Sequence, residues 1–254
     1  MDFIFDTHAH YNDKAFNEDR ANLLDSFSES GILGVINCGT NIEESKKSIQ
    51  LAENYDFVYC AVGFHPEDIN TANENYLSEI KELAMHEKCV AIGEIGLDYY
   101  WVKDNKEEQK RFFTEQLALA NELSLPVIIH SRDAHADTLE ILKKHMPKGV
   151  LHCFSGSVEV MNEALKLGLY IGLGGAVTFK NARVPLEVAK SVPLERLLLE
   201  TDCPYMTPVP FRGKRNQSTY ISYVAEKIAE VKNLTKEEIL TAANNNARNL
   251  FGVK

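Results

Sequence analysis

Six side chains of the kinds that bind metal ions stand at or beside the ends of short apolar runs. They are His8, His10, Glu94, His130, His152 and Asp202. Residues two apart on a β-strand point to the same face, so His8 and His10 could hold one ion from a single strand. An isolated His-x-His pair is a weak signal, and its alternative is an exposed loop pair. Five of the eight apolar runs end in His, Asp or Glu, however, and together they form a strong signal.

This set of side chains predicts bound cations. Carboxylates and imidazoles that converge in one pocket repel or desolvate each other, and divalent cations remove this conflict by lowering the proton affinity of their ligands. Six groups exceed the number that one tetrahedral zinc ion needs. Two ions ~3.5–4 Å apart with a bridging carboxylate fit better. A set rich in imidazole favours zinc, manganese, iron, cobalt or nickel over calcium, and magnesium is less suited.

The elements that must position these side chains are short runs rich in β-branched residues, which alternate with amphipathic stretches. The predicted strands lie near residues 3–7, 33–38, 57–62, 89–94, 126–130, 149–152, 169–172 and 196–201. The predicted helices lie near residues 18–30, 42–54, 73–86, 106–123, 133–146, 157–167, 184–190, 217–231 and 236–248. Thr235 and Glu238 form a capping-box pattern at the start of the last helix.

Eight strand–helix units of ~30 residues account for the whole chain. They predict the α/β class, with a closed (β/α)8 TIM barrel as one domain over residues 1–254. The alternative is a doubly wound open sheet, but no G-x-G-x-x-G pattern follows the first strand to support a dinucleotide site. In a barrel the C-terminal ends of the strands gather at one rim, where the six side chains would meet.

The overall composition excludes several classes of protein. The 254-residue chain has 37 acidic and 27 basic residues, a formal net charge of −10, which argues against coating nucleic acid through a basic surface. No apolar run approaches the ~20 residues that span a bilayer, and no signal peptide is visible. Five widely spaced cysteines without a C-x-x-C pair favour reduced thiols and a cytoplasmic location. We expect no membrane contact and no obligate protein partner.

Eight distinctive segments run nearly from one end of the chain to the other. They are DTHAH (6–10), GFHPED (63–68), GEIGLDYY (93–100), VIIHSRDA (127–134), LHCFSG (151–156), TFKNA (178–182), LLLETDCPYMTP (197–208) and PFRGKRN (210–216). In order and spacing the chain resembles the TatD-type metal-dependent deoxyribonucleases, a branch of the metallohydrolase barrels related to amidohydrolases. Cys203 stands where relatives often have a small residue.

The resemblance implies a centre of two divalent metal ions. The ligands would be His8, His10 and Asp202 for one ion and His130 and His152 for the other. Glu94 would bridge the two ions, in the place of the carboxylated lysine of many amidohydrolase relatives. A water or hydroxide between the ions would be the nucleophile, which makes Asp202 and Glu94 the catalytic residues. Asp202 is the candidate general base, and its competing role is that of a ligand alone.

The same resemblance implies hydrolysis of DNA phosphodiester bonds, including 3′-to-5′ exonuclease action on single strands. Single-stranded DNA or nucleic-acid ends would be the substrate. The alternative is a D-aminoacyl-tRNA deacylase or an amidohydrolase-type enzyme that cleaves C–N or C–O bonds at the same site. A third hypothesis is a barrel that catalyses no reaction and acts through protein contacts. Two divalent ions would add a charge of +4 and change the net charge from −10 to about −6. All of this added positive charge would lie at one rim.

Five residues are predicted to contact the substrate: His65, Arg132, Lys180, Arg212 and Arg215. The resemblance assigns His65 to a phosphate or the leaving group, and its alternative is to stabilise a loop. Arg132 could bind a phosphate through two N–H groups; its alternative is a salt bridge to Asp133. Residues 203–225 contain no acidic side chain, so the loop that carries Arg212 and Arg215 suits a phosphate cradle or a solvated surface. Lys180 would lie nearby.

Several neighbours of the ligand candidates have open roles. Strand parity places Asp6 on the face of His8, where it could hold a ligand imidazole in one tautomer. Glu200 could act similarly or pair with a cation inside the barrel.

The same parity turns the thiols of Cys153 and Cys203 away from the ions, as packing residues. Asp98 could orient a loop or the substrate. The aromatic run 99–101 could stack bases of a single strand or pack over the barrel mouth.

Overall fold

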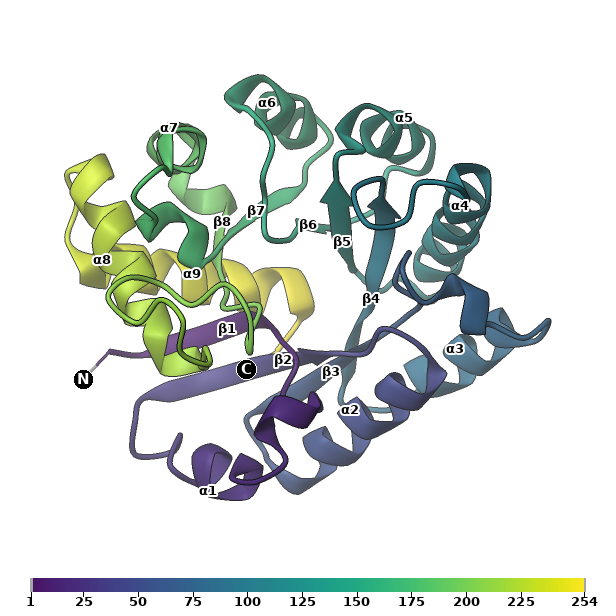
Figure 1. Ribbon diagram of the computed structural model, residues 1–254, viewed down its shortest axis with the longest axis horizontal. Coiled ribbons are helices and arrows are strands. Elements are labelled where there is room, and N and C mark those ends of the chain that lie inside the picture. Colours follow the sequence, from purple (N-terminus) through teal and green to yellow (C-terminus); the bar gives the residue numbers. More distant parts are fainter. Residues whose placement is uncertain (1, 254) are drawn as a thin grey trace.

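The computed structural model of the chain describes residues 2–253 and has eight parallel strands, each hydrogen-bonded to the next in chain order. The strands are β1 (Ile4–Ala9), β2 (Ile32–Cys38), β3 (Val58–Val62), β4 (Cys89–Asp98), β5 (Val127–Arg132), β6 (Gly149–Leu151), β7 (Tyr170–Leu173) and β8 (Leu197–Leu199). They form a nearly closed barrel inside a ring of helices (Figure 1). The predicted (β/α)8 TIM barrel is confirmed.

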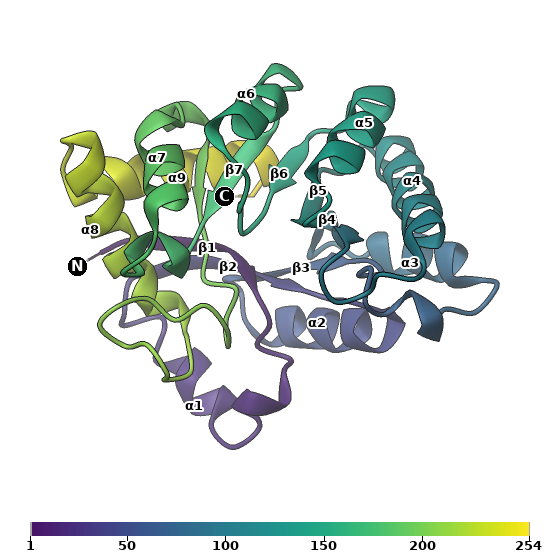
Figure 2. The same ribbon diagram turned by 45° about the horizontal axis from the view of Figure 1, so that its top comes forward.

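The helices alternate with the strands and cover the outside of the barrel (Figures 1 and 2). They are α1 (Arg20–Asp25), α2 (Ile42–Asn54), α3 (Tyr76–Ala84), α4 (Lys106–Leu123), α5 (His135–His145), α6 (Val158–Lys166), α7 (Arg183–Ser191), α8 (Ile221–Lys232) and α9 (Lys236–Phe251). The first helix is shorter than the predicted range 18–30. Thr235 and Glu238 do form the capping box of α9. Among residues 2–253, no helix has both the length and the apolar content needed to cross a membrane.

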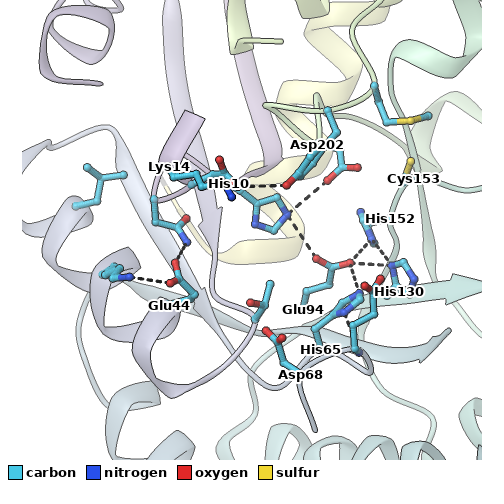
Figure 3. A pocket seen from close by; sticks show the side chains of 18 of the residues that line it. His10, Lys14, Glu44, His65, Asp68, Glu94, His130, His152, Cys153 and Asp202 are labelled. Carbon is cyan, nitrogen blue, oxygen red and sulfur yellow. Dashed lines mark hydrogen bonds and ion pairs between the residues drawn. The ribbon is translucent and has the colours of Figure 1, made fainter. Parts of the chain in front are cut away.

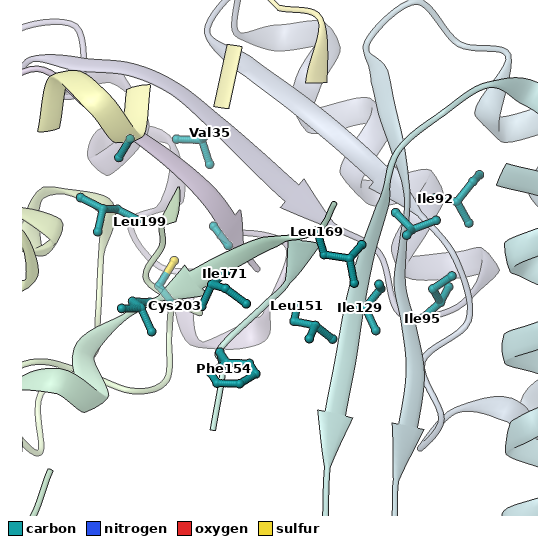
Figure 4. Packing of buried hydrophobic residues seen from close by; sticks show 14 of the residues in the cluster. Val35, Ile92, Ile95, Ile129, Leu151, Phe154, Leu169, Ile171, Leu199 and Cys203 are labelled. Carbon is teal, nitrogen blue, oxygen red and sulfur yellow. The ribbon is translucent and has the colours of Figure 1, made fainter. Parts of the chain in front are cut away.

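Apolar side chains form two layers because both faces of each strand are buried. The larger layer lies between the strands and the helices and includes Val35, Ile92 and Ile129 (Figure 4). The smaller layer fills the barrel interior with side chains such as Phe5 and Ile128. Ala247 and Phe251 of α9 belong to this interior layer. Helix α9 therefore closes the end of the barrel opposite the C-terminal ends of the strands.

The barrel closes between β1 and β8 without a regular strand ladder. An isolated bridge joins Ala9 to Cys203. The backbone N–H of Asp202 donates to the carbonyl of His8 at 3.0 Å, and the N–H of His10 donates to the carbonyl of Cys203 at 2.8 Å. The seam therefore lies directly beside residues that the sequence predicts to bind metal.

Two buried asparagines attach α9 to the barrel. The Asn244 side chain accepts from the Phe5 N–H at 3.0 Å and donates to the Phe3 carbonyl at 2.9 Å. The Asn246 side chain donates to the carbonyls of Leu194 and Leu197, each at 2.8 Å. These bonds satisfy backbone groups of β1 and of the segment that enters β8.

We predict that Asn244→Ala lowers the free energy of unfolding by about 1–3 kcal/mol, because it leaves the buried Phe5 N–H without an acceptor. Urea unfolding followed by circular dichroism measures the change. Asn245→Ala is the matched control, since Asn245 is exposed on the same helix. Equal stability of the two variants would contradict this role of Asn244.

Candidate metal centre

The C-terminal ends of the strands open into one pocket of about 1780 Å3. Side chains from β4, β5 and the segments after β1, β6 and β8 meet in it (Figure 3). His10, Glu94, His130, His152 and Asp202 all line this pocket, as the barrel topology predicts. His8 is completely buried beside them.

Glu94 lies at the centre of the cluster, between His10 on one side and His130 and His152 on the other (Figure 3). With the buried His8 included, its two carboxylate oxygens face two different pairs of histidines. Oε2 is 3.2 Å from Nε2 of His8 and 3.5 Å from Nε2 of His10. Oε1 is 2.9 Å from Nδ1 of His130 and 2.7 Å from Nε2 of His152. One carboxylate therefore stands between two groups of imidazole nitrogens.

Hydrogen bonds on the far side of His10 and His130 determine which ring nitrogen of each can accept a hydrogen bond inside the cluster. Nδ1 of His10 lies 3.1 Å from the carbonyl oxygen of Cys38, to which it can only donate, so Nε2 is left as the acceptor. Nε2 of His130 lies 3.0 Å from Oδ2 of Asp98 and donates to it, which leaves Nδ1 as the acceptor. In the neutral rings both lone pairs point into the cluster, the orientation that a metal ligand needs.

Asp202 joins the group around His8 and His10. Its Oδ1 is 3.7 Å from Nε2 of His8 and 3.5 Å from Nε2 of His10. The residue lies beyond the end of β8 with a φ of 58°, a left-handed conformation that aspartate tolerates better than most residues. About 19% of its side chain is exposed, against 5% for Glu94, so Asp202 is the carboxylate that solvent and substrate reach more easily.

These donor atoms fit divalent cations. The Nε2 atoms of His8 and His10 are only 2.9 Å apart. Oε2 of Glu94 and Oδ1 of Asp202 each lie within 3.7 Å of both nitrogens. Buried acceptors at such separations need a proton or a cation between them. Imidazole and carboxylate are ligands of zinc and other transition metals, and Glu94 can offer one oxygen to each group.

Burial and neighbouring charges shift the pKa values of the clustered side chains in opposite directions. Burial and the neighbouring His152 lower the pKa of His8 to about 4. Burial opposes the charged form of His10 as well, but the hydrogen bond to Asp202 and the charge of Glu94 raise its pKa to about 9. Burial likewise opposes ionisation of Glu94, yet the surrounding imidazoles hold its pKa well below the usual range. The cluster therefore holds protons that bound cations would displace.

His65 lies against the same carboxylate but presents a different atom. Its Nδ1 accepts from the Glu67 N–H at 3.2 Å, so in the neutral ring Nε2 carries the proton. Nε2 is 3.4 Å from Oε1 of Glu94. This tautomer offers a donor rather than a lone pair, which agrees with the predicted contact to a phosphate or leaving group. That assignment stays a prediction.

Asp6 does not hold the His8 imidazole as strand parity suggests, whereas Oε1 of Glu200 lies 3.8 Å from Nδ1 of the buried His152. The register of β1 against β2 shifts between Asp6 and Ala9, and this irregularity separates the Asp6 side chain from that of His8. Asp6 accepts instead from the N–H of His8 and from Thr201. Glu200 accepts from the Cys153 N–H, and burial raises its pKa to about 8. Asp98, on β4, is the carboxylate that contacts the outer nitrogen of another imidazole, that of His130.

The prediction that Cys153 faces away from the site is wrong. β6 ends at Leu151, and Cys153 has a φ of 40°, so strand alternation does not continue through His152. Cys153 is half-buried and lines the pocket beside His152 (Figure 3). Cys203 is fully buried in the apolar layer, in agreement with a packing role.

The four arginine and lysine side chains predicted to contact the substrate do not all line the pocket. Arg132 lines the pocket, whereas Lys180, Arg212 and Arg215 are not among its lining residues. Arg215 forms an ion pair with Asp19 at 2.6 Å. The Arg212 guanidinium lies 4.0 Å from the centre of the Phe179 ring and donates to a backbone carbonyl. Their contact with a phosphate stays a prediction.

Lining residues that sequence reasoning did not select include Lys14 and Tyr205. Lys14 belongs to the loop after β1, and Tyr205 to the loop after β8. Loops after barrel strands lie at the rim, and this rule could have selected both residues.

Comparisons with known proteins show the family of the chain. Residues 5–252 match the family of TatD related DNases. The chain belongs to this family. It is 47% identical over 253 residues to a protein of Bacillus subtilis strain 168 named uncharacterized metal-dependent hydrolase YabD, with 98% of this chain and 99% of that one covered. Family membership places the chain among metal-dependent hydrolases.

Two further relatives show how far the similarity extends within the TatD family. A protein of Edwardsiella piscicida named 3′-5′ ssDNA/RNA exonuclease TatD is 36% identical over 232 residues, with 88% of this chain and 89% of that one covered. The crystal structure of YjjV, a TatD homologue from Escherichia coli K12, matches with a TM-score of 0.92 at 34% identity. That match covers 99% of this chain and 98% of the other.

We predict that Asp98→Asn weakens metal binding at one of the two expected cation sites by about 10- to 100-fold, because an amide no longer fixes the tautomer of His130. Calorimetric titration of metal-stripped protein with Zn²⁺ or Mn²⁺ measures the affinities. Asn can retain the Oδ1 contacts of Asp98 to the backbone of residues 100 and 101. Asp104→Asn, an exposed change in the same loop, is the control. Unchanged affinity at both sites in Asp98→Asn would exclude this role.

Proposed function

We propose that this TatD family member is a nuclease that hydrolyses phosphodiester bonds at the 3′ ends of single-stranded DNA with two divalent cations. The observation that carries the proposal is Glu94, whose two oxygens face separate pairs of histidines. His8, His10 and Asp202 would hold one cation, and His130 and His152 the other. Bound there, two cations would lower the pKa of a water molecule to ~7 and neutralise charge on phosphoryl oxygens.

Asp202 and Glu94 differ in solvent exposure, and we therefore assign them different roles. Glu94 is enclosed by imidazoles on both sides, so it positions the two halves of the site. Asp202 is more accessible and stands at the rim of the pocket, where it can orient a water molecule and accept its proton. His65 and Arg132 present N–H groups at the same pocket, which suits a phosphate and a leaving oxygen.

The pocket supports a polymer end as the substrate. It extends from the ligand candidates into a groove beside α1 and α2, lined by Ala21, Leu51 and Asn54, and the combined volume of about 1780 Å3 exceeds the ~300–1,000 Å3 of most small-molecule sites. The ligand candidates lie at its base, with Glu94 and His152 almost fully buried. A flexible single strand can reach groups at that depth more readily than an intact duplex can. The relative named as a 3′-5′ ssDNA/RNA exonuclease supports the same substrate class and polarity.

The test is to strip the protein of metal, reload it with one divalent ion at a time, and supply end-labelled single- and double-stranded DNA. We expect stepwise shortening of single strands from the 3′ end and much slower attack on duplex. A D-aminoacyl-tRNA assayed beside them distinguishes the ester hydrolase that the same residues could support. Cleavage of that ester alone, or inertness with every ion, would overturn the nuclease proposal.

We predict that Asp202→Asn lowers kcat on single-stranded DNA by about 100-fold or more, the usual range for loss of a general base. Metal content of the loaded variant must be measured beside the rate, because a lost ligand would also lower it. Asp56→Asn is the control, since Asp56 is exposed and precedes β3, at the opposite end of the barrel. Near wild-type turnover with full metal loading would exclude the catalytic role of Asp202.

A further inference from the structure

The single tryptophan of the chain stands exposed at the pocket. Trp101 lies on the loop between β4 and α4, and it lines the pocket that holds the metal-ligand candidates. About 61% of its surface is exposed. Tryptophan is highly buried in most folded proteins, because its ring is the largest apolar group among the side chains. A flat ligand that covered this ring would remove apolar surface from water.

The loop holds Trp101 in place through its backbone. Oδ1 of Asp98 accepts from the N–H of Tyr100 at 2.9 Å and from the N–H of Trp101 at 2.7 Å. The Gln109 side chain donates to the carbonyls of Asp98 at 3.0 Å and Val102 at 2.9 Å. The two ends of the turn are therefore tied to β4 and α4. The backbone that carries the ring is therefore held in place, which lowers the entropy that the loop must lose when a partner binds.

A cation lies beside the exposed ring. The Arg132 guanidinium is 4.2 Å from the centre of the Tyr100 ring and 5.4 Å from the centre of the Trp101 ring. Contact with aromatic faces is favourable for guanidinium and leaves its N–H groups free to bind an anion. A flat aromatic surface next to a positive charge matches a nucleobase joined to its phosphate.

The opposite side of the mouth carries a second exposed ring. Tyr205, on the loop after β8, is 56% exposed and lines the same pocket. Its hydroxyl donates to Asp13 at 3.2 Å, so it is tethered to the loop after β1. β4 and β8 are four strands apart in an eight-stranded barrel, and their loops therefore face each other across the mouth.

We propose that the Trp101 indole is a stacking site for one unpaired nucleobase of the substrate strand, with Arg132 contacting the adjoining phosphate. The site deepens the proposed nuclease function and rests on it. Stacking on an aromatic ring is tolerant of base identity, so the site gives a preference for unpaired bases over paired ones without reading sequence. A paired base presents no free face to the indole.

Intrinsic fluorescence tests this site directly, because Trp101 is the only indole in the chain. Metal-stripped protein is excited at wavelengths that tyrosine does not absorb and titrated with an oligothymidine. The same titration is made with an abasic oligonucleotide of equal length and charge. We expect quenching by the oligothymidine, weaker binding of the abasic strand, and little change in emission when the abasic strand is bound. Equal binding and equal quenching by the two strands would overturn the proposal.

Variants separate stacking from catalysis. Trp101→Leu should weaken oligothymidine binding about 10- to 100-fold, measured by anisotropy of a labelled strand, and raise KM with kcat little changed. The abasic strand should bind this variant as it binds wild type, and Trp101→Phe should restore part of the lost affinity. Phe3→Leu is the control, because Phe3 is an exposed aromatic residue before β1 at the far end of the barrel.

The outcomes also separate this site from the proposed function. If Trp101→Leu cleaves single strands with the KM of wild type, the stacking site is wrong and the nuclease function stands. If the wild-type protein cleaves no nucleic acid and binds neither strand, both proposals are wrong.

Discussion

The candidate metal site depends on how the barrel closes between its first and last strands. His8 and His10 come from the first strand and the residues just after it, and Asp202 follows the last, so they meet only if this seam is held in register. The buried Asp6 carboxylate holds it, because it accepts from the Thr201 N–H at 3.0 Å, the Thr201 hydroxyl at 2.6 Å and the Ser218 hydroxyl at 2.7 Å. Burial raises the pKa of Asp6 to about 6, which shows that these donors only partly offset desolvation.

The sequence predicts which strands carry the reactive side chains but not how each side chain turns. Hydrophobic periodicity located all eight strands, and barrel topology then gathered the residues at their ends. Strand alternation failed at Cys153, because β6 ends at Leu151 and the backbone takes a positive φ. The assignment of Arg215 to a phosphate overlooked Asp19, 196 residues away in sequence, which pairs with it. Irregular strand ends and distant pairings carry no local signal in one sequence.

The net charge of the whole chain does not by itself decide whether a polyanion can bind at the pocket. A formal net charge of −10 opposes binding along a polyanion, and many of the acidic side chains are exposed on the helices. The lining of the pocket also has more acidic than basic side chains, seven against four, so positive charge there depends on the imidazoles around its deepest carboxylate and on the proposed cations. With those cations bound, a strand end can be attracted at one mouth while the outer surface repels the rest of the polymer.

Asp98 links the chemistry of the pocket to its rim. Its Oδ2 receives the N–H of His130, and its Oδ1 receives the N–H groups that open the turn carrying Trp101. A Cβ at Gly96 would collide with the carbonyl of His130, so glycine there lets β4 and β5 approach closely enough for both contacts. One carboxylate on a buried strand therefore contacts both the imidazole of a ligand candidate and the backbone of the turn that carries the exposed indole. In the proposed nuclease this shared anchor would let a base held at the rim guide its phosphate toward the metal centre.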